Sequence, residues 1–241
     1  MRFRPLLWPT VWTVPALALL IGLGVWQLER REWKLALIAD ITAELKKPPV
    51  QMDTLEAAAK AGEKVAYHPV IVSGRLDNAH ELYLYVAAPE DGSGGPPGYH
   101  VITPLLRVSG PTVLVDRGYV PETLKAPDMR VAGQIADLVT IRGVARQSSP
   151  PGLFTPAPEI AQRVWHSRDL ATMAKALGPD PVAPFFVEAD ATENPGGWPR
   201  GGQTRVTLRN EHLTYALTWF GLAATLLGVY LVYHRRNGRL D

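Results

Sequence analysis

Residues 213–233 read LTYALTWFGLAATLLGVYLVY and contain no charged side chain. An α-helix rises about 1.5 Å per residue, so a segment of this length crosses the roughly 30 Å hydrocarbon core of a bilayer. His234, Arg235 and Arg236 follow at once, which is a typical stop-transfer pattern. The stretch therefore predicts a membrane-spanning helix near the C-terminal end of the chain.

A second uncharged block, residues 5–28, lies near the N-terminus. Arg2 and Arg4 precede it, so a cleaved signal peptide is the alternative reading. The block is longer than the apolar region of a usual signal peptide, and no small-x-small cleavage site precedes the charged residues that follow. We therefore predict two spans.

The predicted boundaries are spans at residues 6–28 and 212–233, with a central domain at 29–211 between them. Residues 1–5 and 234–241 then lie on one side of the membrane, which we expect to be the cytoplasm. Positive charges favour this orientation only slightly, because Arg30, Arg31 and Lys34 after the first span oppose those at the two termini.

Composition limits the possible functions. The chain has 241 residues, which suits one medium domain with appendages, and a net charge of only +2, which does not indicate nucleic-acid binding. It contains no cysteine, which excludes disulfides, thiolate metal sites and a cysteine nucleophile. The six histidines are therefore the main candidate metal ligands.

The central region changes from helical to strand-like patterns. The helix of the first span is expected to continue to Pro48, and a short helix at 53–62 has Asp53 as its cap and a Glu56–Lys60 pair. A later helix is expected to be capped by Ser167. Runs rich in Val, Ile, Tyr and Thr predict strands at 67–74, 80–87, 99–108, 112–120, 138–146 and 185–190, with 203–208 leading back to the second span.

The predicted fold class is thus membrane α+β: two transmembrane helices flank a β-rich extracytoplasmic domain, either an antiparallel barrel or a sandwich. No nucleophile elbow, phosphate-binding loop or paired zinc-ligand motif is present, so the sequence does not indicate an enzyme. Isolated histidines at 68, 80, 100 and 166 are expected to be ordinary surface or hydrogen-bonded residues. His234, among arginines, is expected to anchor at the lipid headgroups.

His212 differs because of its neighbours. Helical spacing places Tyr215 and Trp219 on its face, at i+3 and i+7. Trp26 and Gln27 stand at the corresponding depth of the first span, and glycines allow close helix approach at positions 22, 24, 221 and 228. This cluster is either an interfacial aromatic belt or a pocket in which the imidazole binds haem iron.

Four motifs carry a resemblance to a known family. They are GLGVWQLERREWK, PPGYHVITPLLRVSGPTVLVDRGYVP, IRGVAR and NEHLTYALTWF, in that order along the chain. Their order and spacing resemble the surfeit locus protein 1 family of assembly factors for haem–copper oxidases. The resemblance implies no catalysis but support for the insertion of haem a into oxidase subunit I, with the haem a synthesis machinery and membrane lipid as further partners. A scaffold that stabilises subunit I without binding haem is the alternative.

Positions in this sequence take their expected roles from that resemblance. His212 corresponds to the histidine implicated as a haem ligand, and Tyr215 and Trp219 are expected to form a pocket wall. Trp26 and Gln27 match the first-span signature and are expected beside the same site. The resemblance also implies a central domain in the periplasm and spans in a bacterial inner membrane, which the absence of a transit peptide before the first span favours.

The central motif contains Arg117, Gly118, Tyr119 and Pro121. Asp116 and Tyr119 depart mildly from the family pattern, where asparagine and tryptophan are commoner. Gly118 is expected to allow a β-bulge or a close backbone approach. Arg117 is expected to pair with a carboxylate, either an acidic residue of its own domain or a haem propionate.

Overall fold

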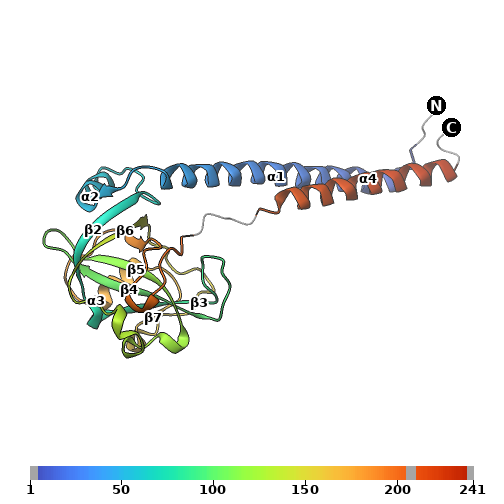
Figure 1. Cartoon of the computed structure of the whole chain (residues 1–241). Coiled ribbons are helices and arrows are strands. Elements are labelled where there is room, and N and C mark those ends of the chain that lie inside the picture. The colour runs from blue at the N-terminus through green and yellow to red at the C-terminus, as the bar shows by residue number, and fades with distance from the viewer. Residues whose placement is uncertain (1–4, 205–209, 238–241) are drawn as a thin grey trace. The chain divides into compact units, whose positions relative to one another are not determined.

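The computed structural model describes residues 5–204 and 210–237. The chain divides into two units, one formed by Met1–Asp40 with Thr207–Asp241 and the other by Ile41–Val206 (Figure 1). The first unit is a pair of helices, and the second is a β-rich domain. This division confirms the predicted arrangement of two long apolar helices that flank a β-rich domain.

Two long helices, α1 (Leu7–Leu45) and α4 (His212–Arg236), run antiparallel. Near the chain ends, the Leu6 backbone N–H donates to His234 Nε2 at 3.0 Å, and Thr10 Oγ1 lies 2.6 Å from the Tyr230 hydroxyl. His234 is buried and also hydrogen-bonds the Tyr230 carbonyl, so it joins the two helices. This contact differs from the headgroup anchor expected for His234.

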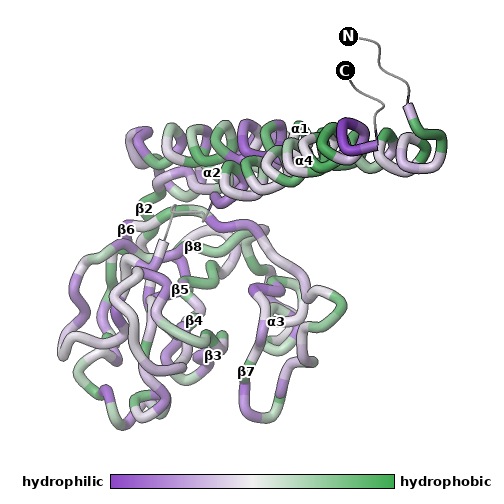
Figure 2. Tube along the Cα trace, turned by 90° about the vertical axis from the view of Figure 1, so that its right-hand side faces the viewer, coloured by the Kyte–Doolittle hydropathy of each residue, from purple (hydrophilic) through white to green (hydrophobic). Residues whose placement is uncertain are grey.

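The most apolar windows of α1 and α4 are exposed: 6% and 11% of their residues are buried. Figure 2 shows apolar residues along both helices. Core helices of a water-soluble domain would be buried, and so large an exposed apolar surface is unfavourable in water. Length and composition therefore fit two membrane spans, with α1 continuing beyond the predicted residue 28.

One glycine permits close contact between the helices. A Cβ atom at Gly24 would lie 2.5 Å from Phe220 Cε1, so the Phe220 ring occupies the space that a side chain would need. Among the described residues, and apart from the neighbouring backbone of the same helix, no atom lies within 4 Å of such a Cβ at Gly22, Gly221 or Gly228. The predicted packing role is confirmed for Gly24 and wrong for the other three.

The β-rich domain is a closed five-stranded barrel, which confirms the barrel alternative. It is not wholly antiparallel as predicted, because the pairing of Val115 with Val187 and of Asp116 with Glu188 is parallel. Its strands are ordered β2–β6–β8–β5–β4, and β2 pairs with β4 through Arg75↔Leu106 and Leu76↔Leu105 to close the cycle. The five strands are β2 (Pro69–Leu76), β4 (Gly98–Leu106), β5 (Val113–Pro121), β6 (Leu138–Arg146) and β8 (Phe186–Ala189). Outside the cycle, β1 (Val50–Gln51) pairs with β2, and β3 (Leu82–Val86) joins β4 to β7 (Val164–Trp165).

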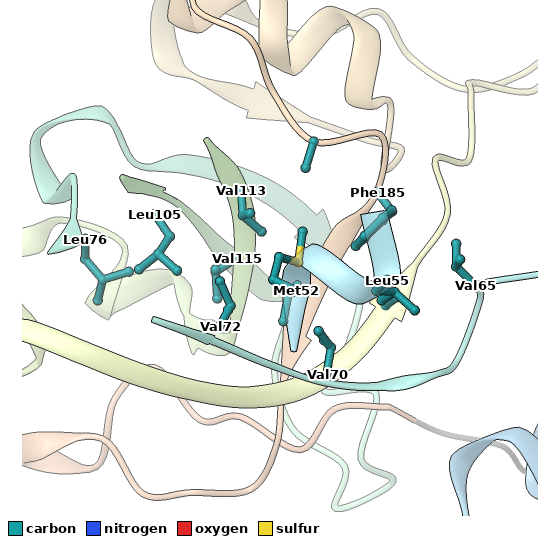
Figure 3. Packing of buried hydrophobic residues seen from close by; sticks show 13 residues of the cluster. Met52, Leu55, Val65, Val70, Val72, Leu76, Leu105, Val113, Val115 and Phe185 are labelled. Carbon is teal, nitrogen blue, oxygen red and sulfur yellow. The ribbon is translucent and has the colours of Figure 1, made fainter. Parts of the chain in front are cut away.

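The main hydrophobic core lies inside the barrel. Alternate residues of β2, Val70, Val72 and Leu76 among them, are buried there, as the two-residue period of a strand predicts. Helix α2 (Met52–Lys60) contributes Met52 and Leu55 to the same cluster (Figure 3). Helix α3 (Leu170–Leu177) packs Met173 against a second cluster on the other face of the sheet.

Short 3₁₀ segments at Asn78–His80, Glu122–Leu124, Pro127–Gly133, Ile160–Gln162 and Pro195–Gly197 connect these elements. The predicted helix caps were wrong in detail. Asp169, not Ser167, caps α3, because its side chain accepts hydrogen bonds from the Ala171 and Thr172 N–H groups. Asp53 lies in the first turn of α2 rather than at its cap, and Glu56 accepts a hydrogen bond from Arg107.

The strand suggested for residues 203–208 falls mostly on residues 205–209, which lie outside the described residues.

Candidate functional site

His212 is the first residue of α4, and its imidazole is oriented by Gln27 of α1. His212 Nδ1 lies 2.7 Å from Gln27 Oε1. An amide oxygen only accepts hydrogen bonds, so Nδ1 carries the proton and donates it. In the neutral imidazole the other ring nitrogen, Nε2, then keeps its lone pair, the form in which an imidazole binds a metal ion.

The imidazole lines an open hollow of about 270 Å³. We call it the His212 hollow; its lining residues are Gln27, Lys34, Glu211, His212 and Tyr215. Sequence reasoning missed Lys34 and Glu211. Their signal was present, because Lys34 lies seven residues after Gln27 on the same helix face and Glu211 adjoins His212.

The structure brings together three of the predicted site residues, Gln27, His212 and Tyr215. Trp219 is partly buried and Trp26 is half exposed, and neither lines the hollow. Trp219 follows His212 by two helical turns and continues its face along α4.

Arg117 belongs to the barrel and is buried there. Its Nη2 donates to the Gly133 carbonyl at 2.6 Å and to Asn194 Oδ1 at 3.1 Å. Its Nη1 lies 3.8 Å from Glu81 Oε1, so its carboxylate partner in this structure is a residue of its own domain. Burial lowers the pKa of Arg117 to about 10, against the opposing attraction of Glu81.

The predicted irregularity at Gly118 is confirmed. Arg117 and Gly118 together face the single residue Val101 across the β4–β5 pairing, which is a β-bulge. Gly118 has a φ of +107°, and a Cβ atom there would lie 1.9 Å from the Arg200 carbonyl oxygen. This close approach accompanies the two backbone hydrogen bonds between Tyr119 and Arg200.

A buried ionic network beside this bulge was not anticipated. His100 Nδ1 lies 2.9 Å and 3.0 Å from the two Asp116 oxygens, and the Gly118 N–H donates to the same carboxylate at 3.0 Å. Arg168 Nη2 links Asp116, at 3.3 Å, to Glu90, at 3.2 Å.

The pKa values of this network shift in the directions that pairing favours. Burial disfavours both charged forms, but Asp116 raises the pKa of His100, and the His100 imidazolium with Arg168 lowers the pKa of Asp116. Asp116 likewise raises the pKa of Arg168. All of these partners belong to the barrel domain, so the network reads as an internal structural one.

The remaining histidines are hydrogen-bonded or lie beside a carboxylate, as expected. His68 Nδ1 lies 2.7 Å from Glu44, and His80 Nδ1 lies 2.7 Å from Asp77. His166 Nε2 lies 3.8 Å from Glu159.

Together, the fold and the oriented imidazole define a class: a protein with two candidate membrane-spanning helices, a β-barrel domain between them in the sequence and a histidine at one end of the helix pair. Residues 14–224 match the model of the SURF1 family. The chain belongs to that family.

Named relatives cover most of the chain. The chain is 40% identical over 216 residues to Surfeit locus protein 1 of Gallus gallus, and the aligned region covers 84% of this chain and 67% of the relative. It is 38% identical to Surfeit locus protein 1 of Takifugu rubripes, over 84% of this chain and 87% of the relative. A SURF1-like protein of Rickettsia conorii is 30% identical over 92% of this chain and 90% of its own length.

Proposed function

We propose that this protein is an assembly factor for haem–copper cytochrome c oxidase, which holds haem a at the membrane and assists its insertion into subunit I. The observation that carries the proposal is the Gln27–His212 hydrogen bond, which leaves His212 Nε2 as an acceptor at the His212 hollow. Membership of the SURF1 family supports the same role.

The residues present suit a haem group. Imidazole is a common axial ligand of haem iron, and the Gln27 carboxamide oxygen is the kind of outer partner that orients such a ligand. Tyr215 supplies an aromatic ring, and Lys34 supplies a cation suited to a propionate. Trp26 and Trp219, outside the hollow itself, would cover more of the macrocycle.

An open site suits transfer better than storage. The hollow is slightly smaller than the roughly 300–1,000 Å³ pockets that enclose drug-sized ligands. If haem a binds here, His212 would hold it through the iron, and the open hollow would leave the bound group accessible to subunit I.

Arg117 is not needed for this site, because Glu81, Gly133 and Asn194 are its partners in the barrel. We propose that these contacts hold the Arg117 side chain within the barrel domain, apart from the haem site. We further propose that the spans lie in a bacterial inner membrane, with the barrel domain in the periplasm and both termini in the cytoplasm.

Co-expression with haem a synthesis, followed by purification and absorption spectroscopy, tests the proposal. We expect haem a to co-purify with the protein and to show the spectrum of a histidine-ligated haem. A colourless protein that still binds oxidase subunit I would support the scaffold function instead.

A further inference from the structure

The barrel domain contains a pocket of about 280 Å³, separate from the His212 hollow, beside the free edge of β6. We call it the β6-edge pocket. Leu76, Ile135, Val139 and Ile141 supply apolar walls, and residues 189–190 and 192–195 also line the pocket. Arg117, only 2% exposed, also lines it.

The pocket exists because β8 is short. β8 pairs with β6 only from Gly143↔Ala189 to Arg146↔Phe186, and one further hydrogen bond joins the Asp190 N–H to the Arg142 carbonyl. β6 continues to Leu138 in pairing with β2. Within residues 5–204 and 210–237, no strand pairs with residues 138–141 on the β8 side, so the barrel wall is open there.

The charge beside this opening is unbalanced. Arg117 and Arg130 share one buried carboxylate, Glu81, so the three side chains carry a net positive charge. Arg130 forms the closer pair: its Nη2 lies 2.5 Å from Glu81, against 3.8 Å for Arg117 Nη1. Arg117 Nη1 is buried and has no hydrogen-bond partner in the part of the chain that the structure describes. A buried donor without a partner is unfavourable, so this group favours an added acceptor.

The acidic residues at the pocket do not supply that acceptor. Asp190 accepts a hydrogen bond from the Thr192 N–H, and Glu193 is exposed, where water and salt screen its charge. Arg142, also at the rim, offsets one of these two negative charges.

We propose that the β6-edge pocket binds a carboxylate carried on a short apolar body. The carboxylate accepts a hydrogen bond from Arg117 Nη1, and the apolar body lies against Leu76, Val139 and Ile141. Two sources share this chemistry: a free monocarboxylic acid and the C-terminal residue of a peptide, whose amide would also meet the open backbone edge of β6. The binding does not depend on haem.

Ligand-observed NMR on the full chain in nanodiscs tests the proposal, with empty nanodiscs as the baseline. The probes are pentanoate, N-acetylvaline and the neutral pentanamide. We expect pentanoate to bind at least tenfold more tightly than pentanamide, which corresponds to about 1.4 kcal/mol. Tighter binding of N-acetylvaline than of pentanoate identifies a peptide terminus as the source, and equal or weaker binding identifies a free acid.

Variants assign the binding to this pocket. Arg117→Gln should weaken pentanoate at least tenfold, whereas Arg142→Gln, which removes an exposed cation from the rim, should change it less than twofold. Thr192→Trp should also weaken pentanoate, because the ring fills the opening without touching the buried charges. That variant keeps the test decisive if Arg117→Gln does not fold. Equal affinity for pentanoate and pentanamide, absence of binding, or unchanged binding in Thr192→Trp would each overturn the proposal.

Discussion

At the residue scale, the role of a histidine depends on which of its ring nitrogens forms a hydrogen bond within the protein. Gln27 engages Nδ1 of His212 and so leaves Nε2 for a metal ion. His234 is the contrasting case, because both of its ring nitrogens have protein partners, the Leu6 N–H and the Tyr230 carbonyl. The same residue type therefore serves as a proposed ligand at one end of the helix pair and as a structural contact at the other.

Gly118 cannot be replaced by a residue with a side chain. Gly118→Ala would combine an unfavourable positive φ with a collision against the Arg200 carbonyl, and we expect it to lower the free energy of unfolding by more than about 3 kcal/mol. Gly62→Ala is the matched control: Gly62 also has a positive φ, +79°, but among the described residues no atom beyond its chain neighbours lies within 4 Å of the added Cβ. It should cost only about 1–2 kcal/mol. Denaturant unfolding of the full chain in detergent measures both, and equal costs would contradict the bulge geometry.

The His100–Asp116 pair should make stability depend on pH. Asp116 raises the pKa of His100, so this contribution is present below about pH 6.5 and is lost as pH rises through the raised value. The lowered pKa of Asp116 gives a contribution present above about pH 4 and lost as pH falls through the lowered value. The pair therefore stabilises most between about pH 4 and pH 6.5.

His100→Gln should lower the free energy of unfolding by about 1.5–3 kcal/mol in that pH range, the usual contribution of a hydrogen bond to a charged group. The loss should be smaller at higher pH. Thermal unfolding of the full chain across this pH range measures the difference from wild type. His80→Gln, at an exposed pair with Asp77, is the control and should cost less than about 1 kcal/mol at every pH. A His100→Gln cost that stays constant with pH would show that the pair is not ionised.

At the element scale, the helix pair and the barrel use close approach differently. In the barrel, the bulged strand β5 lies close to the backbone at Arg200, and two backbone hydrogen bonds join Tyr119 of β5 to Arg200. Between α1 and α4, Phe220 fits against Gly24, so one helix presents a ring where the other has no side chain. Packing of this kind favours helix association in lipid, where burial of apolar surface gives no advantage.

Gly24→Ile should separate the helices, because the Phe220 ring already fills the space. We expect a loss of about 1–3 kcal/mol, the usual cost of overpacking. Gly22→Ile is the control, since no atom lies within 4 Å of a Cβ there. Thermal unfolding in detergent compares the two variants, and equal stability of both would contradict the helix contact.

At the scale of the whole molecule, the sequence predicts the features that depend on local composition better than those that depend on how distant strands pair. The two apolar helices were predictable because lipid imposes length and hydrophobicity on a local segment, and the longer strands because Val, Ile and Tyr are enriched in them. Barrel closure was not predictable from the sequence, because it depends on the pairing of Arg75 with Leu106, and no local pattern reveals the register of two such distant positions. The two-residue strands β1 and β7 are too short to leave a pattern.

Some residues near the candidate sites could likewise be predicted from local spacing, whereas others depend on how the strands pair. His212, Tyr215 and Gln27 were grouped correctly from helical spacing and depth, which are regular along a helix. The His100–Asp116 contact depends on which strands pair and on the bulge between them, so it could not be read from spacing.

Two spans would put both termini on the same side of the membrane, and the proposed orientation makes that side the cytoplasm. Because the sequence has no cysteine, single cysteines report position without background. In cells whose outer membrane is permeabilised and whose inner membrane is intact, a maleimide that cannot cross the inner membrane should label Gly94→Cys in the exposed β3–β4 loop. It should not label Asn237→Cys after α4. Disruption of the inner membrane should then make both reactive. The opposite labelling pattern would place the barrel domain in the cytoplasm.

The haem content of the His212→Ala protein tests the central claim most directly. Wild type, His212→Ala and the exposed control His80→Ala would be purified from cells that synthesise haem a, and haem per polypeptide and the Soret band would be compared. We expect His80→Ala to match wild type and His212→Ala to lose at least nine-tenths of the haem, with Gln27→Leu losing about 10–100-fold in affinity because the imidazole is no longer oriented. Wild-type haem content and an unchanged Soret band in His212→Ala would contradict the account.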